Sequence, residues 1–90
     1  MEFDWDGANT EHIARHGVAI EECEEAYRNG PMAIEHQSRK GERRGLCLGE
    51  TRNGRLLTFV ITERIGKIRF VTAFPMHPKQ RAIYRQQEER

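Results

Sequence analysis

The sequence of 90 residues is poor in cysteine and has no long apolar run, and each shortage excludes a class of protein. Its two cysteines, Cys23 and Cys47, are too few for a disulfide framework, so we expect small buried thiols in a reducing compartment. No apolar stretch reaches the roughly 18 residues of a membrane span, and the N-terminus lacks the apolar core of a signal peptide. We therefore expect a cytoplasmic protein with no membrane partner.

The sequence also lacks a large excess of charge of either sign. Its 15 Lys and Arg oppose 14 Asp and Glu, which gives a formal net charge of +1. This is not the balance of a globally basic nucleic-acid binder. The charges are unevenly placed, however, because acidic residues dominate positions 1–37 and basic residues dominate positions 39–85. This asymmetry indicates one face for an anionic partner and another face for a different partner.

The N-terminal part predicts a short strand over residues 2–5 and then two helices. Asp6 is suited to cap a first helix that runs to His16, and Gly17 supplies the left-handed residue that ends it. A second helix is expected over residues 19–29. Its glutamates are expected to face water: Glu21, Glu22, Glu24 and Glu25.

After residue 31 the apolar period changes to two, which predicts strands. We expect these strands over residues 32–37, 45–49, 55–63 and 67–74, with a polar loop at 38–42. Asn53-Gly54 predicts a type I′ hairpin turn, Ile65-Gly66 makes the next turn, and Pro78 suits the first turn of a last, weakly docked helix. The order β-α-α-β-β-β-β-α predicts one α+β domain over residues 1–90, with an antiparallel sheet and the helices packed on one side.

The last two strands carry the charged residues that most resemble a reactive site. Two strand ends are expected to gather a carboxylate and three cations beside the last helix: Glu63, Arg64, Lys67 and Arg69. A carboxylate among cations can move a proton and hold charge on phosphorus, which RNA cleavage without a metal requires. A hairpin with ordinary solvated charges explains the same residues. Tyr84 either closes this site or only anchors the last helix, and Arg81 of that helix is a further candidate for RNA binding.

Two other groups have both a functional and an ordinary interpretation. The basic loop is either a patch that positions RNA phosphates or a solvated turn, and it contains Arg39, Lys40, Arg43 and Arg44. His12 and His16 share one helix face, at a spacing that can bind zinc. The segment lacks the glutamate that zinc hydrolases place after the first histidine, so we expect no metal and no cofactor. His16 either helps to close its helix or moves protons.

Taken in order, several short motifs of the chain resemble the BrnT toxin family. They are Phe3-Asp4-Trp5-Asp6, Arg15-His16-Gly17-Val18, Gly54-Arg55-Leu56-Leu57, Thr62-Glu63-Arg64, Ile68-Arg69 and Arg81-Ala82-Ile83-Tyr84. The resemblance implies a RelE-like fold and the toxin of a type II toxin–antitoxin system, a metal-independent endoribonuclease that cleaves mRNA and inhibits translation. It also implies a BrnA-type antitoxin partner with a ribbon-helix-helix domain, through which alone the complex binds DNA.

The resemblance further implies a set of catalytic residues: His16, Glu63, Arg64, Arg69 and Tyr84. This sequence departs from the family pattern at one position, because the fourth strand ends in Thr72-Ala73-Phe74 where the pattern has arginine last. Strand alternation places Phe74 on the face of Ile68 and Phe70. Losing one phosphate-directed donor can cost about 3–4 kcal/mol of transition-state stabilisation. The alternative function is therefore a catalytically weak binding module that acts mainly through its antitoxin in a DNA-binding repressor complex.

Overall fold

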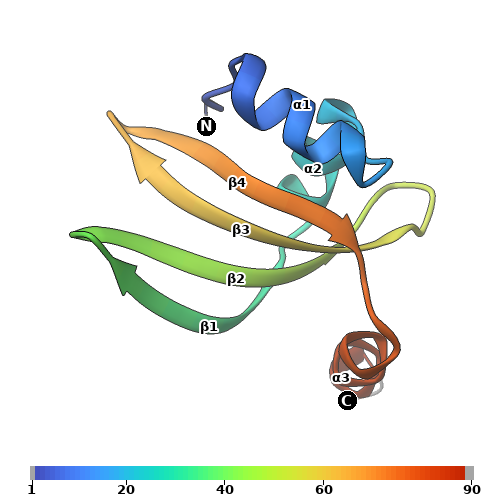
Figure 1. The fold of residues 1–90 in the computed structure, drawn as a ribbon. Helices are drawn as coiled ribbons and strands as arrows, with labels where there is room; N and C mark the ends of the chain where they lie inside the picture. The colour runs from blue at the N-terminus through green and yellow to red at the C-terminus, as the bar shows by residue number, and fades with distance from the viewer. Residues whose placement is uncertain (1, 89–90) are drawn as a thin grey trace.

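Four strands form one antiparallel sheet, and helices lie against both of its faces (Figure 1). The structure, a computed structural model, describes residues 2–88. Its elements within these residues are α1 (Gly7–Arg15), α2 (Ile20–Arg28), β1 (Met32–Arg39), β2 (Glu42–Glu50), β3 (Leu56–Arg64), β4 (Lys67–Pro75) and α3 (Pro78–Glu88). The predicted α+β class and element order are confirmed, although the first strand is reduced to one bridge between Phe3 and Ile68. None of the described helices is long and apolar enough to cross a membrane.

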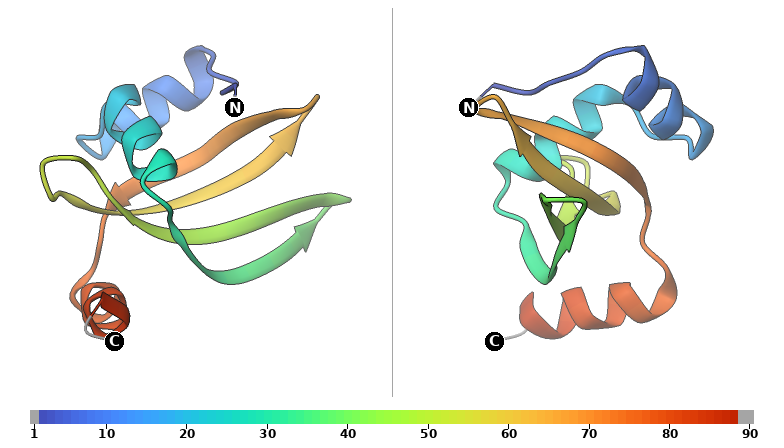
Figure 2. Two further views of the ribbon diagram at one scale, coloured as in Figure 1. Left: turned by 180° about the vertical axis from the view of Figure 1, so that it is seen from behind. Right: turned by 60° about the vertical axis from the view of Figure 1, so that its left-hand side comes forward.

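The hydrophobic core lies between one face of the sheet and helices α1 and α2 (Figure 2). Phe59 of β3 and Phe70 of β4 are fully buried at its centre, with ring centroids 5.1 Å apart. Gly49 of β2 faces the same layer, and a Cβ added there would lie 3.0 Å from the Phe59 ring and 3.2 Å from the carbonyl oxygen of Ala26. Glycine at this position therefore lets α2 pack directly on the sheet.

Both ends of α1 form as the sequence predicts. The Asp6 side chain accepts hydrogen bonds from the backbone N–H groups of Ala8 and Asn9, which caps the first turn. Gly17 has a φ of 73°, and the next residue, Val18, donates its N–H to the carbonyl oxygen of Ile13 at 3.1 Å. This left-handed residue with the returning hydrogen bond is the usual helix stop at glycine.

The N-terminal segment packs against the core, whereas the acidic helix α2 differs from the prediction. Trp5 stacks on Phe70 with ring centroids 5.3 Å apart, and Phe3 lies 6.1 Å from the same ring. The prediction that all four glutamates of α2 face water is wrong. Three of them bond to other parts of the chain: Glu22 to Arg55, Glu24 to the indole N–H of Trp5 and Glu25 to the backbone N–H of Arg52.

The turns between strands differ from the predicted ones in two places. The predicted polar loop at 38–42 is a two-residue turn, Lys40-Gly41, because both residues have positive φ and the flanking residues pair as strands. The predicted type I′ turn at Asn53-Gly54 is absent, since only Gly54 has a positive φ. Instead a five-residue connection over 51–55 is closed by the Thr51 N–H and the carbonyl oxygen of residue 55.

A β-bulge in β4 overturns the predicted strand faces. Between two register pairs with β3, the residue Val71 is left over. The extra residue shifts the alternation by one, so Ala73 joins the core while Thr72 and Phe74 turn to the opposite face. The prediction that Phe74 shares the face of Phe70 is therefore wrong.

Helix α3 lies on the opposite side of the sheet from α1 and α2, so the prediction of helices on one side is also wrong (Figures 1 and 2). It begins at Pro78, as predicted. The Thr58 hydroxyl donates to Gln80 Oε1 at 2.7 Å, and the backbone N–H of His77 donates to the same oxygen at 2.9 Å. Of its side chains described in residues 78–87, none is buried and only Gln80 and Tyr84 are half-buried. The helix is thus attached through Gln80 in its first turn and through half-buried Tyr84, without a buried side chain among these residues, in line with the expected weak docking.

Both cysteines are free and buried, as predicted. Burial raises the pKa of the Cys23 thiol to about 12 and also raises the pKa of the Cys47 thiol. Because the thiolate is the reactive form, neither group is suited to nucleophilic chemistry at neutral pH.

Candidate functional site

The turn between β1 and β2, Lys40-Gly41, and the turn between β3 and β4, Ile65-Gly66, lie at the same end of the sheet (Figure 1). Exposed cations lie at and beside these turns. We term the following residues the basic end: Arg39, Lys40, Arg43, Arg64 and Lys67. Within residues 2–88, only Lys67 of this set has a carboxylate within ion-pair distance, Glu2 at 3.6 Å. The charges of the basic end are therefore open to an anionic ligand.

The charged residues predicted from the last two strands do gather at this end, but on two faces. Strand register pairs Arg64 with Lys67 and Thr62 with Arg69. Glu63 faces the side of the sheet that carries α1 and α2, where it lines a cavity of about 630 Å³ together with Arg43. By strand alternation, Arg64 faces the other side.

Tyr84 does not join this group. Its hydroxyl donates to Glu50 Oε1 at 3.4 Å, and Glu50 pairs with Leu56 at the start of β3. Arg64 is eight residues further along that strand, or about 26 Å away. The expected position of the last helix beside the charged cluster is therefore wrong. Arg81 lies on the same distant helix and donates to the carbonyl oxygen of Met76 at 3.1 Å.

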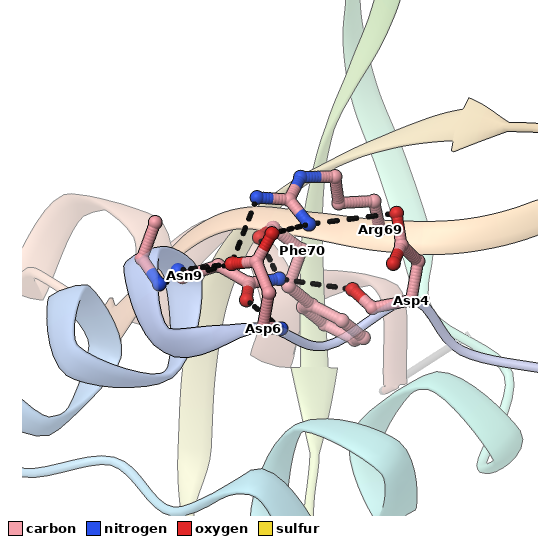
Figure 3. Close-up of polar contacts among 6 residues, drawn as sticks. Asp4, Asp6, Asn9, Arg69 and Phe70 are labelled. Carbon is pink, nitrogen blue, oxygen red and sulfur yellow. Dashed lines mark hydrogen bonds and ion pairs between the residues drawn. The ribbon is translucent and has the colours of Figure 1, made fainter.

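Arg69 is held by two carboxylates of the N-terminal segment (Figure 3). Its Nη1 lies 3.4 Å from Asp4 Oδ2 and 3.0 Å from Asp6 Oδ2, and its side chain is 15% exposed. The Asn9 side-chain amide donates to the carbonyl oxygens of Asp4, at 3.0 Å, and of Phe70, at 3.2 Å. We term these contacts the Arg69 clamp, because they attach the start of α1 to the exposed edge of β4.

The clamp also balances the charge of Arg69. The hydrogen bond from Arg69 is the main reason why the pKa of Asp6 is lowered, and the same contact raises the pKa of Arg69. A phosphate would have to compete with two carboxylates for this cation. An Arg69→Ala variant would therefore disturb the fold as well as any chemistry.

A hollow of about 270 Å³ lies beside the clamp and is lined by α1 and by residues of β2, β3 and β4. Its lining includes Arg44, Arg69, Thr62, Val71 and His12, and we term it the cation pocket. Arg44 Nε lies 2.7 Å from Glu42 Oε1, so this arginine also has a carboxylate partner. His12 Nε2 lies 3.0 Å from Thr72 Oγ1, which fixes the imidazole at the rim of the pocket.

His12 and His16 form an imidazole pair on α1, with ring centroids 5.3 Å apart. His16 is the C-cap of the helix, and its ring centroid lies 6.0 Å from that of Phe74. His12 was not among the predicted catalytic residues, although its four-residue spacing from His16 was the available signal. Among the residues that the structure describes, no three potential metal-ligating side chains form a group.

Together these features define a small α+β protein with exposed cations at one end of its sheet and a pair of imidazoles beside a hollow lined by arginines. Residues 5–80 match a family described as the ribonuclease toxin BrnT of type II toxin–antitoxin systems. The chain belongs to this family, which confirms the resemblance seen in its motifs. Membership implies an RNA substrate and an antitoxin partner. A comparison with individual curated proteins gives no match.

We predict that the free energy of unfolding falls at acidic pH because Asp6 of the clamp becomes protonated. Its lowered pKa means that ionised Asp6 stabilises the fold above its ordinary value of about 3.9 and that this contribution is lost as the pH falls through the folded value. Asp6→Asn keeps the capping oxygen but removes the charge. The variant should be less stable than the unmodified protein at neutral pH, and the difference should shrink below about pH 4.

Urea unfolding at a series of pH values measures this difference. The matched control is Glu11→Gln, which removes an exposed ion pair with Arg15 and should change stability little at any pH. A destabilisation by Asp6→Asn that stays constant down to low pH would show that the charge of Asp6 does not stabilise the clamp.

Proposed function

We propose that the protein is an endoribonuclease that cleaves mRNA without a metal ion and thereby inhibits translation. The observation that carries this proposal is the imidazole pair of His12 and His16 beside the cation pocket. Cleavage through the 2′-hydroxyl needs one group that accepts its proton and another that protonates the leaving oxygen. Two imidazoles can supply both, because histidine changes its charge near neutral pH. Membership of a family of ribonuclease toxins supports the same reaction.

In this reaction the 2′-oxygen attacks the adjacent phosphorus and the bond from phosphorus to the 5′-oxygen breaks. One neutral imidazole takes the proton from the 2′-hydroxyl, and the other, protonated, gives a proton to the 5′-oxygen. The products are a 2′,3′-cyclic phosphate, which water can open to a 3′-phosphate, and a 5′-hydroxyl. We assign these two roles to His12 and His16. Glu63 is the alternative proton acceptor, since it stands beside the basic end.

The arginines then have different roles. Arg64 and its neighbours at the basic end attract the RNA backbone, because exposed cations bind phosphates without reading sequence. Arg69 acts by fixing α1, and hence His12, through the clamp. Tyr84 and Arg81 of α3 would contact the RNA chain beyond the reacting phosphate.

We predict that His12→Asn and His16→Asn each slow RNA cleavage by about 10²–10⁴-fold, the usual contribution of a general acid or base. Labelled RNA incubated with each variant in the presence of EDTA measures the rate, and thermal melts should be unchanged because both side chains are exposed. The matched control is His36→Asn, an exposed histidine on β1, which should cleave normally. If both α1 variants cleave RNA at the full rate and Glu63→Gln does not, Glu63 and not the imidazoles transfers the proton. Cleavage by the unmodified protein that EDTA abolishes would contradict the metal-independent reaction.

A second candidate is a catalytically weak module that acts mainly through its antitoxin. The observation that favours it is the pairing of both arginines of the cation pocket with carboxylates: Arg44 with Glu42, and Arg69 with Asp4 and Asp6. Little uncompensated positive charge remains there to stabilise a transition state. Phe74, at the position where the family pattern has arginine, adds no charge either.

Phe74→Arg tests this weakness directly. Phe74 is half-buried on the sheet face opposite the core, and its ring lies near His16, so an arginine there can reach the reacting phosphate without entering the core. We predict that cleavage rises at least tenfold, equivalent to about 1.4 kcal/mol, with little change in melting temperature. Phe74→Gln is the uncharged control and should give no gain. Lost stability without a faster reaction would remove position 74 from the site.

We propose further that the partner is a BrnA-type antitoxin with a ribbon-helix-helix domain and that DNA is bound only through it. The acidic helix α2 supports this, because its carboxylates would repel DNA phosphates. In gel-shift experiments with operator DNA, the isolated chain should give no specific complex, whereas the chain with its antitoxin should. A tight, sequence-specific shift by the isolated chain would refute this.

A further inference from the structure

A second hollow lies next to the imidazole pair, where the end of β4, the end of α1 and the start of α3 meet. It has a volume of about 540 Å³, and its walls are mostly rings: His16, Phe74, Pro75, His77 and Pro78. None of these rings lies in the core between the sheet and helices α1 and α2. We term it the ring pocket.

The rings of this pocket are held in place by the backbone around them. The centroids of Phe74 and His77 lie 5.3 Å apart with their planes tilted by 31°, and His16 closes the side at 6.0 Å from Phe74. The backbone N–H of His77 donates to Gln80, and that of the buried Met76 donates across to β3 at 3.1 Å. A flat ligand would therefore meet a wall that is already formed.

Thr72 connects the ring pocket to the proposed site of reaction. It lines the ring pocket, and its hydroxyl oxygen lies 3.0 Å from Nε2 of His12, which lines the cation pocket. The cation pocket is thus lined by an imidazole and by two arginines that each have a carboxylate partner, and the ring pocket mostly by rings. A nucleotide has the same division, with an anionic phosphate at one end and a flat, polarisable base at the other.

We propose that the ring pocket is a subsite for one unpaired nucleobase of the RNA substrate, stacked against Phe74 and His77. This inference rests on the proposed function, since it assigns the ligand next to the reacting phosphate. Aromatic and imidazole rings stack on the face of any base, and the ring nitrogens of His16, at the side of the pocket, can donate to or accept from its edge. A base in a duplex cannot enter, so the substrate is single-stranded at this position.

A double-mutant cycle combines removal of the RNA bases with removal of the Phe74 ring. It tests the subsite by measuring RNA binding without cleavage. The probes are a single-stranded 2′-fluoro RNA, which lacks the attacking hydroxyl, and the same sugar-phosphate backbone without bases. For the unmodified protein, removal of the bases should weaken binding by about 5–150-fold, the range that stacking of one base covers. For Phe74→Leu, the intact RNA should bind more weakly while the baseless backbone binds as before. The ratio of the two affinities, intact RNA over baseless backbone, should therefore fall.

Arg64→Ala is the matched control, because it removes a phosphate contact from the basic end. It should weaken both probes equally and leave the ratio unchanged. A thermal melt confirms that Phe74→Leu is folded, and Ile83→Ala, on α3 outside the ring pocket, should behave as the unmodified protein.

The outcomes separate the subsite from the catalytic proposal. If Phe74→Leu weakens both probes equally, or neither, the base subsite is refuted. If it instead weakens only the complex with the antitoxin, the ring pocket takes a protein side chain and the inference is equally wrong. Absence of RNA cleavage by a protein that shows the binding cycle would refute the catalytic proposal and leave the subsite standing.

Discussion

The contact of Arg69 with Asp4 and Asp6 is the interaction on which the arrangement of the site depends. Helix α1 has only nine residues, and a helix of that length is marginal by itself. The clamp fixes its first turn, because Asp6 both caps the helix and binds Arg69, while Asn9 bridges two backbone carbonyls. With that end fixed, α1 extends along β4 and holds its histidines over the strand edge. The charge of Arg69 therefore contributes to positioning.

The β-bulge at Val71 is the second constraint. Without it, Phe74 would point into the core with Phe70, and Ala73 would face outward. With it, the small Ala73 fills the core position and Phe74 emerges beside His16 and His77. One inserted residue thus converts the end of a core strand into the wall of a ring-lined pocket. The same shift brings Thr72 within 3.0 Å of His12, so the two hollows share a border.

Local signals in the sequence predicted the parts of the fold that depend on neighbouring residues. Asp6 as a cap, Gly17 as a stop and the change of apolar period after residue 31 all describe contacts within a few positions. The errors concern contacts between distant segments. Nothing near Val71 marks a bulge, and the attachment of α3 to the far face depends on Gln80 meeting Thr58, 22 residues away. Likewise Arg69 looked like a free cation because its two carboxylate partners are more than 60 residues earlier.

The same distinction explains why the candidate site was only partly predicted. The charged residues of the two hairpins could be grouped, since adjacent antiparallel strands bring their ends together. The imidazole pair could be recognised as sharing one face, but its place beside β4 follows from the clamp. The basic end and the ring pocket lie at opposite ends of β4. Lys67 at the basic end and Phe74 at the ring pocket are seven residues apart, or about 23 Å. An RNA that contacts both must extend over several nucleotides. In the proposed reaction, cations far from the imidazoles would therefore raise affinity without stabilising the transition state, and the rate would depend on the few groups around His12.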